Sequence, residues 1–235
     1  MASVELEAVT FRYEDMAMEF DLRVAAGECF AVIGPSGAGK TTLLSLIAGF
    51  DAPLSGRVRI DGRDVTALAP ALRPVTTLFQ EHNLFAHLDA AENVGLGIDP
   101  GLRLAPDDRA RVADALARVG LAGMERRLPR ELSGGERQRV ALARVLVRNR
   151  PVLLLDEPFA ALGPALRFEM LDLVAELRAA AALTVVLVSH QPEDARRIAD
   201  RAAFVHDGCI LAQGPLPDLL DHPPAPELAA YLGAA

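Results

Sequence analysis

Apolar residues along the 235-residue chain fall into short runs and alternations that predict strands separated by helices. Residues 4–11 and 18–24 alternate apolar with polar positions, as half-buried strands joined by a turn do. Residues 29–33, 152–155 and 183–188 are continuous apolar runs, which are typical of strands buried on both faces. The pattern therefore predicts an α/β protein that begins with antiparallel strands.

Helical periodicity follows or separates these strands. We expect further strands over residues 57–62 and 75–79, and helices over residues 40–48, 107–119, 139–147 and 165–180. Between about residues 89 and 150 the predicted segments are all helical, whereas strands precede and follow that region. We therefore interpret the chain as one domain with an α/β core from residues 1–85 and 151–235 and an inserted helical subdomain over 86–150. The tail from Pro215 predicts a short helix at most.

A glycine-rich segment connects the strand at 29–33 to the helix at 40–48, and it reads Gly34, Pro35, Ser36, Gly37, Ala38, Gly39, Lys40, Thr41, Thr42. Glycines in such a turn let successive backbone N–H groups converge on phosphate oxygens at the positive end of the following helix. Lys40 would reach the β and γ phosphates and the Thr41 hydroxyl would bind Mg²⁺. The alternative, an ordinary glycine turn, is disfavoured by the buried strand before it. The segment predicts a protein that binds a nucleoside triphosphate and hydrolyses it.

Composition singles out the same loop. Lys40 is the only lysine among 24 lysines and arginines, so a chain that otherwise uses arginine keeps a compact ammonium at this position. The formal net charge of −8 provides no electrostatic footprint for nucleic acid. We expect an intracellular protein without a signal peptide or membrane span, and we interpret the two cysteines, Cys29 and Cys209, as packing residues.

Two carboxylates, Asp156 and Glu157, follow the apolar run at 152–155. Neither belongs in a core without a partner. At the tip of a strand beside the phosphate loop, Asp156 would join the Mg²⁺ shell and Glu157 would take a proton from the attacking water. The alternative is a strand that ends in a solvated acidic pair.

A second glycine loop, Ser133, Gly134, Gly135 and Glu136, opens the helix before residue 147. It offers N–H groups and a hydroxyl at a helix N-terminus, which together form an anion site. It also matches a capping box, with Ser133 as the cap and Glu136 three residues later. The residues alone favour the capped helix.

The order of these motifs resembles the ATP-binding cassette (ABC) ATPases over essentially the whole chain. The resemblance rests on the phosphate loop at Gly34, Gln80 after a strand, Leu-Ser-Gly-Gly-Glu at 132–136, the Asp156-Glu157 pair, and His190 after a buried strand. It implies a P-loop NTPase core of the RecA-like type, with ATP and Mg²⁺ bound. It also implies that two copies of the chain sandwich two ATP molecules head to tail, so that the second glycine loop contacts the γ phosphate held by the other copy.

Further residue roles follow from the resemblance only. Tyr13 would stack on adenine, Gln80 would contact Mg²⁺ and the water, and His190 would hydrogen-bond the γ phosphate. Tyr13 as a strand-end aromatic and Gln80 as an ordinary loop amide remain alternatives. The chain departs from the family where Gly163 replaces the usual aspartate after Ala-Leu. We therefore expect slower or less cooperative hydrolysis than in relatives.

Among cassettes, the stretches 48–50, 73–75, 78–85 and 93–102 are similar to the ATPases of bacterial thiamine importers. This likeness implies a peripheral subunit at the cytoplasmic face of the bacterial inner membrane, bound to a permease that works with a periplasmic thiamine-binding protein. Leu84, Phe85 and Leu88 would then line a groove for a permease helix, although core packing is an equal alternative.

Cassette ATPases that transport nothing, and GTPases, fit the sequence less well. The chain lacks the long heptad arms of chromosome and repair ATPases and the paired cassettes of translation factors, and it has no Asn-Lys-x-Asp guanine signature. Importers of iron or polyamines remain alternatives, because a cassette does not touch the cargo.

Overall fold

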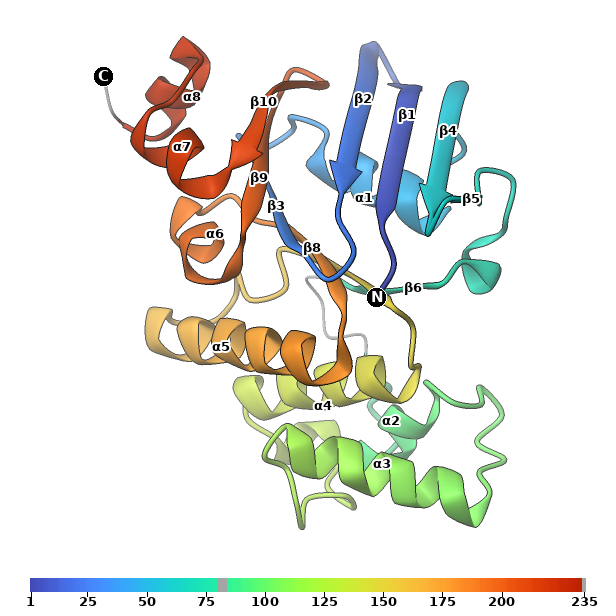
Figure 1. Ribbon diagram of the computed structural model, residues 1–235. Coiled ribbons are helices and arrows are strands. Elements are labelled where there is room, and N and C mark those ends of the chain that lie inside the picture. Colours follow the sequence, from blue (N-terminus) through green and yellow to red (C-terminus); the bar gives the residue numbers. More distant parts are fainter. Residues whose placement is uncertain (80–83, 234–235) are drawn as a thin grey trace.

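The computed structural model describes residues 1–79 and 84–233, whose strands form one sheet in the order β5-β4-β1-β2-β10-β9-β3-β8-β7-β6 (Figure 1). The strands are β1 (Val4–Tyr13), β2 (Met16–Val24), β3 (Cys29–Ile33), β4 (Ser55–Ile60), β5 (Arg63–Asp64), β6 (Val75–Leu78), β7 (Val152–Asp156), β8 (Thr184–Val188), β9 (Arg201–His206) and β10 (Cys209–Pro215). The α-helices are α1 (Lys40–Ala48), α2 (Ala90–Gly95), α3 (Pro106–Arg118), α4 (Gly134–Val147), α5 (Pro164–Ala181), α6 (Pro192–Ile198), α7 (Leu216–Asp221) and α8 (Pro226–Tyr231). Short 3-10 helices span Pro70–Leu72 and Pro129–Glu131.

The first part of the sheet is antiparallel, as the alternating pattern predicts. β1 pairs with β2 on one side and with β4 on the other, and β2 alternates exposed and buried positions along its length. Side chains of successive residues in a strand point to opposite faces, so one face of β2 packs inward while the other meets solvent. Tyr13 lies at the end of β1, beside the turn into β2.

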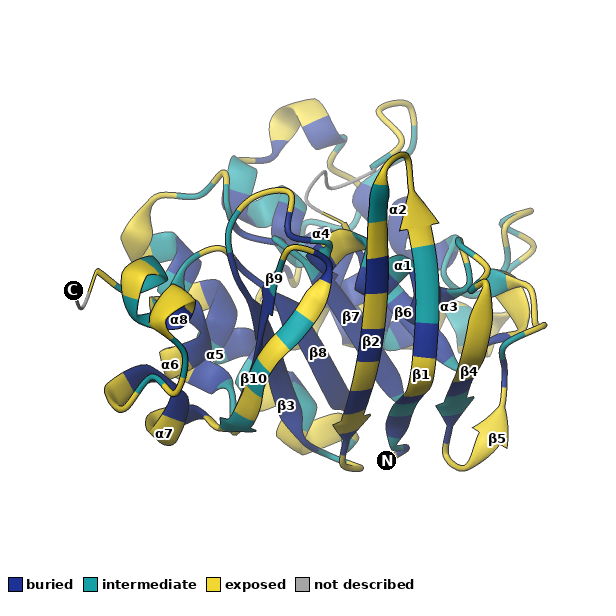
Figure 2. Cartoon of the chain, turned by 90° about the horizontal axis from the view of Figure 1, so that it is seen from above, coloured by how far each residue is buried: buried dark blue, intermediate teal, exposed yellow. Residues whose placement is uncertain are grey.

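The centre of the sheet is parallel and fully buried. β3 pairs with β8, β8 with β7 and β7 with β6, all in parallel, and every residue of β3 and β8 is buried. These strands are the dark blue ribbons in the middle of Figure 2. Because parallel strands all end at the same edge, the segments that follow β3, β7 and β8 meet there.

Two hydrophobic clusters cover the two faces of these strands. Leu153 and Val185 belong to one cluster, together with residues of α4 and α5, whereas their neighbours Leu154 and Val186 belong to the other, together with residues of α1. Helices α2, α3 and α4 pack on one another on the α5 side of the sheet (Figure 1). The α/β class and the P-loop type of core are therefore confirmed.

Two helices, α7 and α8, follow Pro215, where a short helix at most was expected, and the two strands before them were not predicted. β9 and β10 form a hairpin closed by Asp207 and Gly208, both at positive φ (44° and 80°), and α7 and α8 follow. An Asp-Gly pair is a strong hairpin signal, because both central residues of the turn need left-handed backbone. Cys209 is exposed on β10, so the packing interpretation was wrong for it and holds for Cys29 alone, which is buried.

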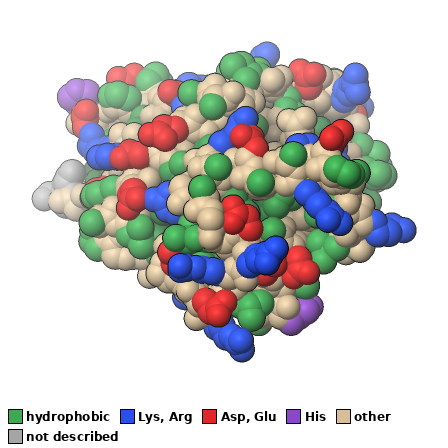
Figure 3. Space-filling view, turned by 90° about the horizontal axis from the view of Figure 1, so that it is seen from below, with side chains coloured by type: hydrophobic (Ala, Val, Ile, Leu, Met, Phe, Trp, Pro, Cys, Tyr) green, Lys and Arg blue, Asp and Glu red, His purple; other side chains and the backbone are tan. Residues whose placement is uncertain are grey.

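Charges of both signs are mixed on the helical side of the molecule, which Figure 3 shows from below. On α3, for example, Arg111 pairs with Asp108 and Arg118 with Asp114. Within the described part of the chain, no helix is both long and apolar enough to cross a bilayer.

Candidate functional site

The phosphate loop follows β3, and two of its glycines have positions that a residue with a side chain would strain. Gly34 has φ 148°, and a Cβ there would lie 2.1 Å from the Val205 carbonyl oxygen. Gly39 has φ 103° and ends the loop at the N-terminus of α1. The tight approach of the loop to β9 at one end and its left-handed backbone at the other explain the spacing of the motif.

Lys40, the first residue of α1, extends back over the loop. Its Nζ donates to the carbonyl oxygens of Gly34 at 2.9 Å and Pro35 at 2.7 Å, and the residue is only 5% exposed. Burial lowers the pKa of Lys40, while the nearby charges of Glu157 and Asp156 act in the opposite direction. The ammonium is thus held within the loop and faces two carboxylates.

Asp156 ends β7 and faces the start of α1. The Thr41 hydroxyl donates to its Oδ1 at 3.2 Å. Burial raises the pKa of Asp156, as does the charge of Glu157, whereas the Thr41 hydrogen bond and Lys40 lower it. Two oxygen donors from separate elements are therefore paired at the mouth of the phosphate loop.

Glu157 leaves the line of its strand and turns toward His190. Its φ of 44° is unusual for a residue with a side chain, and its N–H donates to the Val188 carbonyl at 3.0 Å. Left-handed backbone costs a side-chain-bearing residue about 1–3 kcal/mol, so the surrounding contacts hold it there. Its Oε2 lies 3.0 Å from Nδ1 of His190. The ends of β7 and β8 thus bring a carboxylate and an imidazole together.

A cleft of about 410 Å³ opens above these groups. Its lining combines the loop and the start of α1 with Glu157 and the turn between β1 and β2: Tyr13, Glu14, Asp15, Met16, Met18, Ser36, Gly37, Gly39, Lys40, Thr41, Thr42 and Glu157. Tyr13 is 60% exposed, so one face of its ring is open at the rim. Tyr13, Lys40, Thr41 and Glu157 therefore share one cleft. Asp156 and His190 are not among its lining residues and contact Thr41 and Glu157 instead.

The second glycine loop lies at the start of α4 and is absent from the lining of this cleft. Ser133 caps the helix, since its Oγ accepts from the Glu136 N–H at 3.3 Å and Glu136 Oε2 accepts from the Ser133 N–H at 2.7 Å. A Cβ on Gly135 would lie 2.8 Å from the Leu166 side chain, whereas Gly134 faces more open space. α4 thus begins at Gly134, earlier than the predicted 139, because the capping box starts the helix within the loop.

Gln80 falls outside the described residues, so the structure is silent on its position. Residues 85–89 are held by buried Asn93, which accepts from the Phe85 N–H at 2.8 Å and donates to the carbonyl oxygens of Phe85, Leu88 and Asp89.

A polar network behind His190 has no counterpart in the sequence analysis. The Ser189 hydroxyl donates to Asp194 at 2.6 Å, and Asp194 forms an ion pair with Arg167 of α5 at 2.8 Å. Gln138 of α4 donates to the Pro158 carbonyl, just after Glu157, at 2.6 Å. Arginine, aspartate and glutamine on helices are ordinary in sequence, so only the fold identifies these supports.

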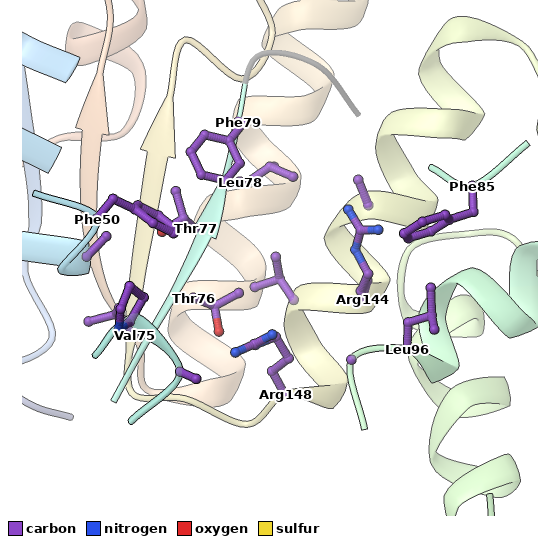
Figure 4. Close-up of a pocket in the computed structure, with 16 residues that line it drawn as sticks. Phe50, Val75, Thr76, Thr77, Leu78, Phe79, Phe85, Leu96, Arg144 and Arg148 are labelled. Atoms are coloured by element: carbon purple, nitrogen blue, oxygen red, sulfur yellow. The ribbon is translucent and has the colours of Figure 1, made fainter. Parts of the chain in front are cut away.

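A second hollow, of about 420 Å³, lies between the sheet and the helical region (Figure 4). Phe50 and Phe79 approach at 5.7 Å between ring centroids on the sheet side. Phe85 lies on the opposite side, and Arg144 and Arg148 of α4 extend between. We name this hollow the α4 groove. Its lining includes Phe85 but neither Leu84, which packs on the helical core, nor Leu88.

Known proteins resemble this chain in sequence and in structure. A sequence model described as ABC transporter matches residues 17–160. A thiamine import ATP-binding protein ThiQ from Chelativorans sp. is 58% identical over 233 residues, covering 99% of this chain and 95% of its own. The ThiQ protein of Mesorhizobium japonicum is 56% identical, with 99% and 92% covered. A solved dimeric, post-hydrolysis ATP-binding cassette, MJ0796, bound to ADP and phosphate, has a TM-score of 0.77 and 31% identity, covering 91% of this chain and 98% of its own. The chain belongs to the ABC transporter family.

Proposed function

We propose that this chain is the ATP-hydrolysing subunit of a bacterial thiamine importer. One observation carries the ATPase part: segments far apart in sequence place Lys40, Thr41 and Glu157 on the lining of one cleft. Asp156 lies 3.2 Å from Thr41, and His190 lies 3.0 Å from Glu157. A buried cation, two oxygen donors and a carboxylate next to an imidazole are the groups that phosphoryl transfer needs.

The phosphates of ATP bind where Lys40 now contacts the Gly34 and Pro35 carbonyls. Lys40 then exchanges those carbonyls for β- and γ-phosphate oxygens, and the backbone N–H groups of residues 36–42 bind the rest. Tyr13 at the rim is placed to stack on adenine. Pro35 and Ala38 shape the loop rather than contribute side-chain polar groups.

The residues present fit Mg²⁺. Thr41 Oγ1 and Asp156 Oδ1 are hard oxygen donors 3.2 Å apart, and Mg²⁺ in nucleotide sites is bound by one or two such groups with phosphate and water. When bound, the ion neutralises charge that develops on the phosphates. We propose Thr41 and Asp156 as its protein ligands, with Gln80 as a third contact.

Glu157 accepts the proton of the attacking water. His190, 3.0 Å from Glu157, hydrogen-bonds the γ phosphate and orients the carboxylate. The left-handed backbone at Glu157 turns its side chain from the strand axis toward the cleft that it lines.

Closure of the site requires a second copy. In one copy, Ser133 is exposed and Gly134 is half-buried at the start of α4, and neither lines the cleft of the same chain. We propose that Ser133, Gly134, Gly135 and Glu136 of the partner cover the γ phosphate, head to tail. The assembly as a dimer of the solved relative MJ0796 supports this arrangement.

Gly163→Asp is expected to raise the ATPase rate and its Hill coefficient, because the family's usual carboxylate would return to the dimer interface. A coupling free energy of about 1–3 kcal/mol between the two ATP sites corresponds to a change in affinity of about 5–150-fold. A Cβ at Gly163 meets no atom within 4 Å, and Gly163 is the N-cap of α5 without a side-chain cap, so aspartate should also stabilise the fold by about 0.3–1 kcal/mol. Steady-state ATPase titrations measure the effect. Gly163→Asn, which caps without charge, is the control; equal rates for all three proteins would contradict the prediction.

Asp156→Asn is expected to raise the melting temperature at neutral pH while abolishing Mg²⁺-dependent hydrolysis. Burial raises the pKa of Asp156, so the folded state disfavours the ionised form relative to the unfolded chain. The gain in stability of the asparagine variant is full at pH values above the pKa of Asp156 in the folded state. It disappears as the pH falls below the pKa of this carboxyl in the unfolded state, where both states are protonated. Each kcal/mol shifts the melting temperature of a chain this size by about 2–4 °C.

Asp172→Asn is the control for the pH series. Its hydrogen bonds from Arg197 lower the pKa of Asp172, so its stabilisation is present at neutral pH and lost in acid. The two variants should therefore shift stability in opposite directions at neutral pH. Equal changes in melting temperature for the two variants, measured by calorimetry, would contradict the interpretation that the folded state disfavours the ionised form of Asp156.

The permease binds at the α4 groove. Its apolar walls suit the hydrophobic face of a helix. Burial lowers the pKa of Arg144, and the charge of Arg148 lowers it further. Phe50 and Phe85 are more than half exposed at its edges. Bound there, the subunit lies peripherally at the cytoplasmic face of the inner membrane. We propose that residues 86–150 form a helical subdomain, whose helix α4 contributes Arg144 and Arg148 to this groove.

Thiamine as cargo is supported by the names of relatives that are 51–58% identical. We further propose a periplasmic thiamine-binding protein as a partner of the permease. The test is co-expression with candidate permeases and ATP-driven uptake into proteoliposomes of thiamine, its phosphates, Fe³⁺ and polyamines. We expect thiamine uptake. Uptake of another solute alone would overturn the cargo but keep the ATPase, whereas no ATP hydrolysis in any pairing would overturn the ATPase.

A further inference from the structure

A tyrosine near the end of the chain contacts the main chain of His190. The Tyr231 hydroxyl, on α8, donates to the His190 carbonyl oxygen at 2.7 Å. The neighbours of His190 are held by other groups: the Ser189 N–H donates to the Val32 carbonyl at 3.2 Å, and the Gln191 N–H to the Ser189 hydroxyl at 3.0 Å. Tyr231 therefore holds the peptide plane from which the His190 side chain projects.

The ring of Tyr231 is itself fixed. It lies 5.5 Å from the ring of Phe204, which is fully buried on β9, and Phe204 is opposite Ile33 of β3. The backbone of Gly34, the first residue of the phosphate loop, acts to lower the pKa of the phenol, against the larger effect of burial. A tyrosine has only two side-chain torsions, so a ring held by packing positions its hydroxyl at little entropic cost.

The hydroxyl remains a donor across the physiological range. Burial raises the pKa of Tyr231 to about 12. Attachment of α8 does not depend on this hydroxyl, because Leu228 is fully buried and Leu232 packs on the same cluster. The hydrogen bond thus adds a constraint on the His190 turn beyond what holds the helix.

We propose that Tyr231 is a positioning residue, which ties α8 to the His190 turn and keeps the imidazole aligned with Glu157 for hydrolysis. The proposal rests on the proposed role of His190. It makes the end of the chain part of the catalytic arrangement, although none of its side chains lines the ATP cleft.

Tyr231→Phe tests the proposal on the full chain, since it keeps the ring against Phe204 and removes only the oxygen. We expect kcat to fall about three- to ten-fold, the ratio that corresponds to one hydrogen bond of ordinary net strength. The KM for ATP should stay unchanged, because the ATP-binding residues of the cleft are untouched. An unchanged kcat would overturn the proposal.

Two further variants separate positioning from stability and from the role of His190. Leu232→Ala weakens the packing of the same region without touching the hydrogen bond, and should lower the melting temperature with kcat retained. In a His190→Ala background, measured in single turnovers with radiolabelled ATP, Tyr231→Phe should have no further effect. The same fold-loss in both backgrounds would overturn the positioning role. A His190→Ala protein with full activity would overturn the proposed role of His190 itself.

Discussion

Glu157→Gln is expected to lower the rate of ATP hydrolysis about 10²- to 10⁴-fold while ATP binding persists. The amide keeps the size of the side chain and its contact with His190, now 3.0 Å away, but it cannot accept a proton from water. Removing a negative charge from the cleft also reduces repulsion of the triphosphate, so binding should hold or tighten. Steady-state ATPase assays and equilibrium binding of labelled ATP separate the two effects.

Glu176→Gln is the matched control for this change. Glu176 is exposed on α5 and does not line the cleft, so the same substitution there should leave the rate as it is. A Glu157→Gln protein that hydrolyses ATP as fast as the control would remove Glu157 from the role of base. The proton would then have to leave by another route, such as the γ phosphate itself.

Arg73→Met is expected to lower the free energy of unfolding by about 3–5 kcal/mol, out of a total of about 5–15 kcal/mol for proteins of this kind. The buried guanidinium donates to four carbonyl oxygens, those of Leu46, Ile47, Thr66 and Leu68, at 2.6–3.0 Å. Methionine fills the space but leaves these carbonyls without a donor, and each costs about 1–3 kcal/mol. The variant also removes the buried positive charge of Arg73, and the free energy gained in this way offsets only part of that loss.

Helix α1 links this stability effect to the ATP site. Arg73 holds the carbonyls at its C-terminal end, and Lys40 and Thr41 stand at its N-terminal end, so the variant should also raise the KM for ATP. Denaturant unfolding followed by circular dichroism measures the stability. Arg63→Met, an exposed arginine on β5, should change it by no more than about 0.5 kcal/mol. Equal unfolding midpoints for the two variants would contradict the prediction.

Much of the fold follows from local pattern. The predicted helix at 40–48 has the bounds of α1, and the apolar run at 152–155 becomes β7 with Asp156 as its last residue. Buried parallel strands must be apolar throughout, and a loop that binds phosphate needs glycine at set places, so both leave a mark in sequence. Membership of the ABC transporter family, expected from the order of motifs, is confirmed by the comparisons. The roles of the site residues remain predictions.

The chain's sequence alone determined which groups we expect to carry the chemistry: the phosphate loop with its single lysine, the Asp156-Glu157 pair and His190. Only the tertiary structure decided how they are held. Arg73 and Tyr231 act through backbone carbonyl oxygens, which every residue has, so no residue type at the far end of these hydrogen bonds marks them in the sequence. A contact between Tyr231 and His190, 41 positions apart, exists because Tyr231 packs on Phe204 of β9, and this placement of α8 is a property of the tertiary fold and not of either segment.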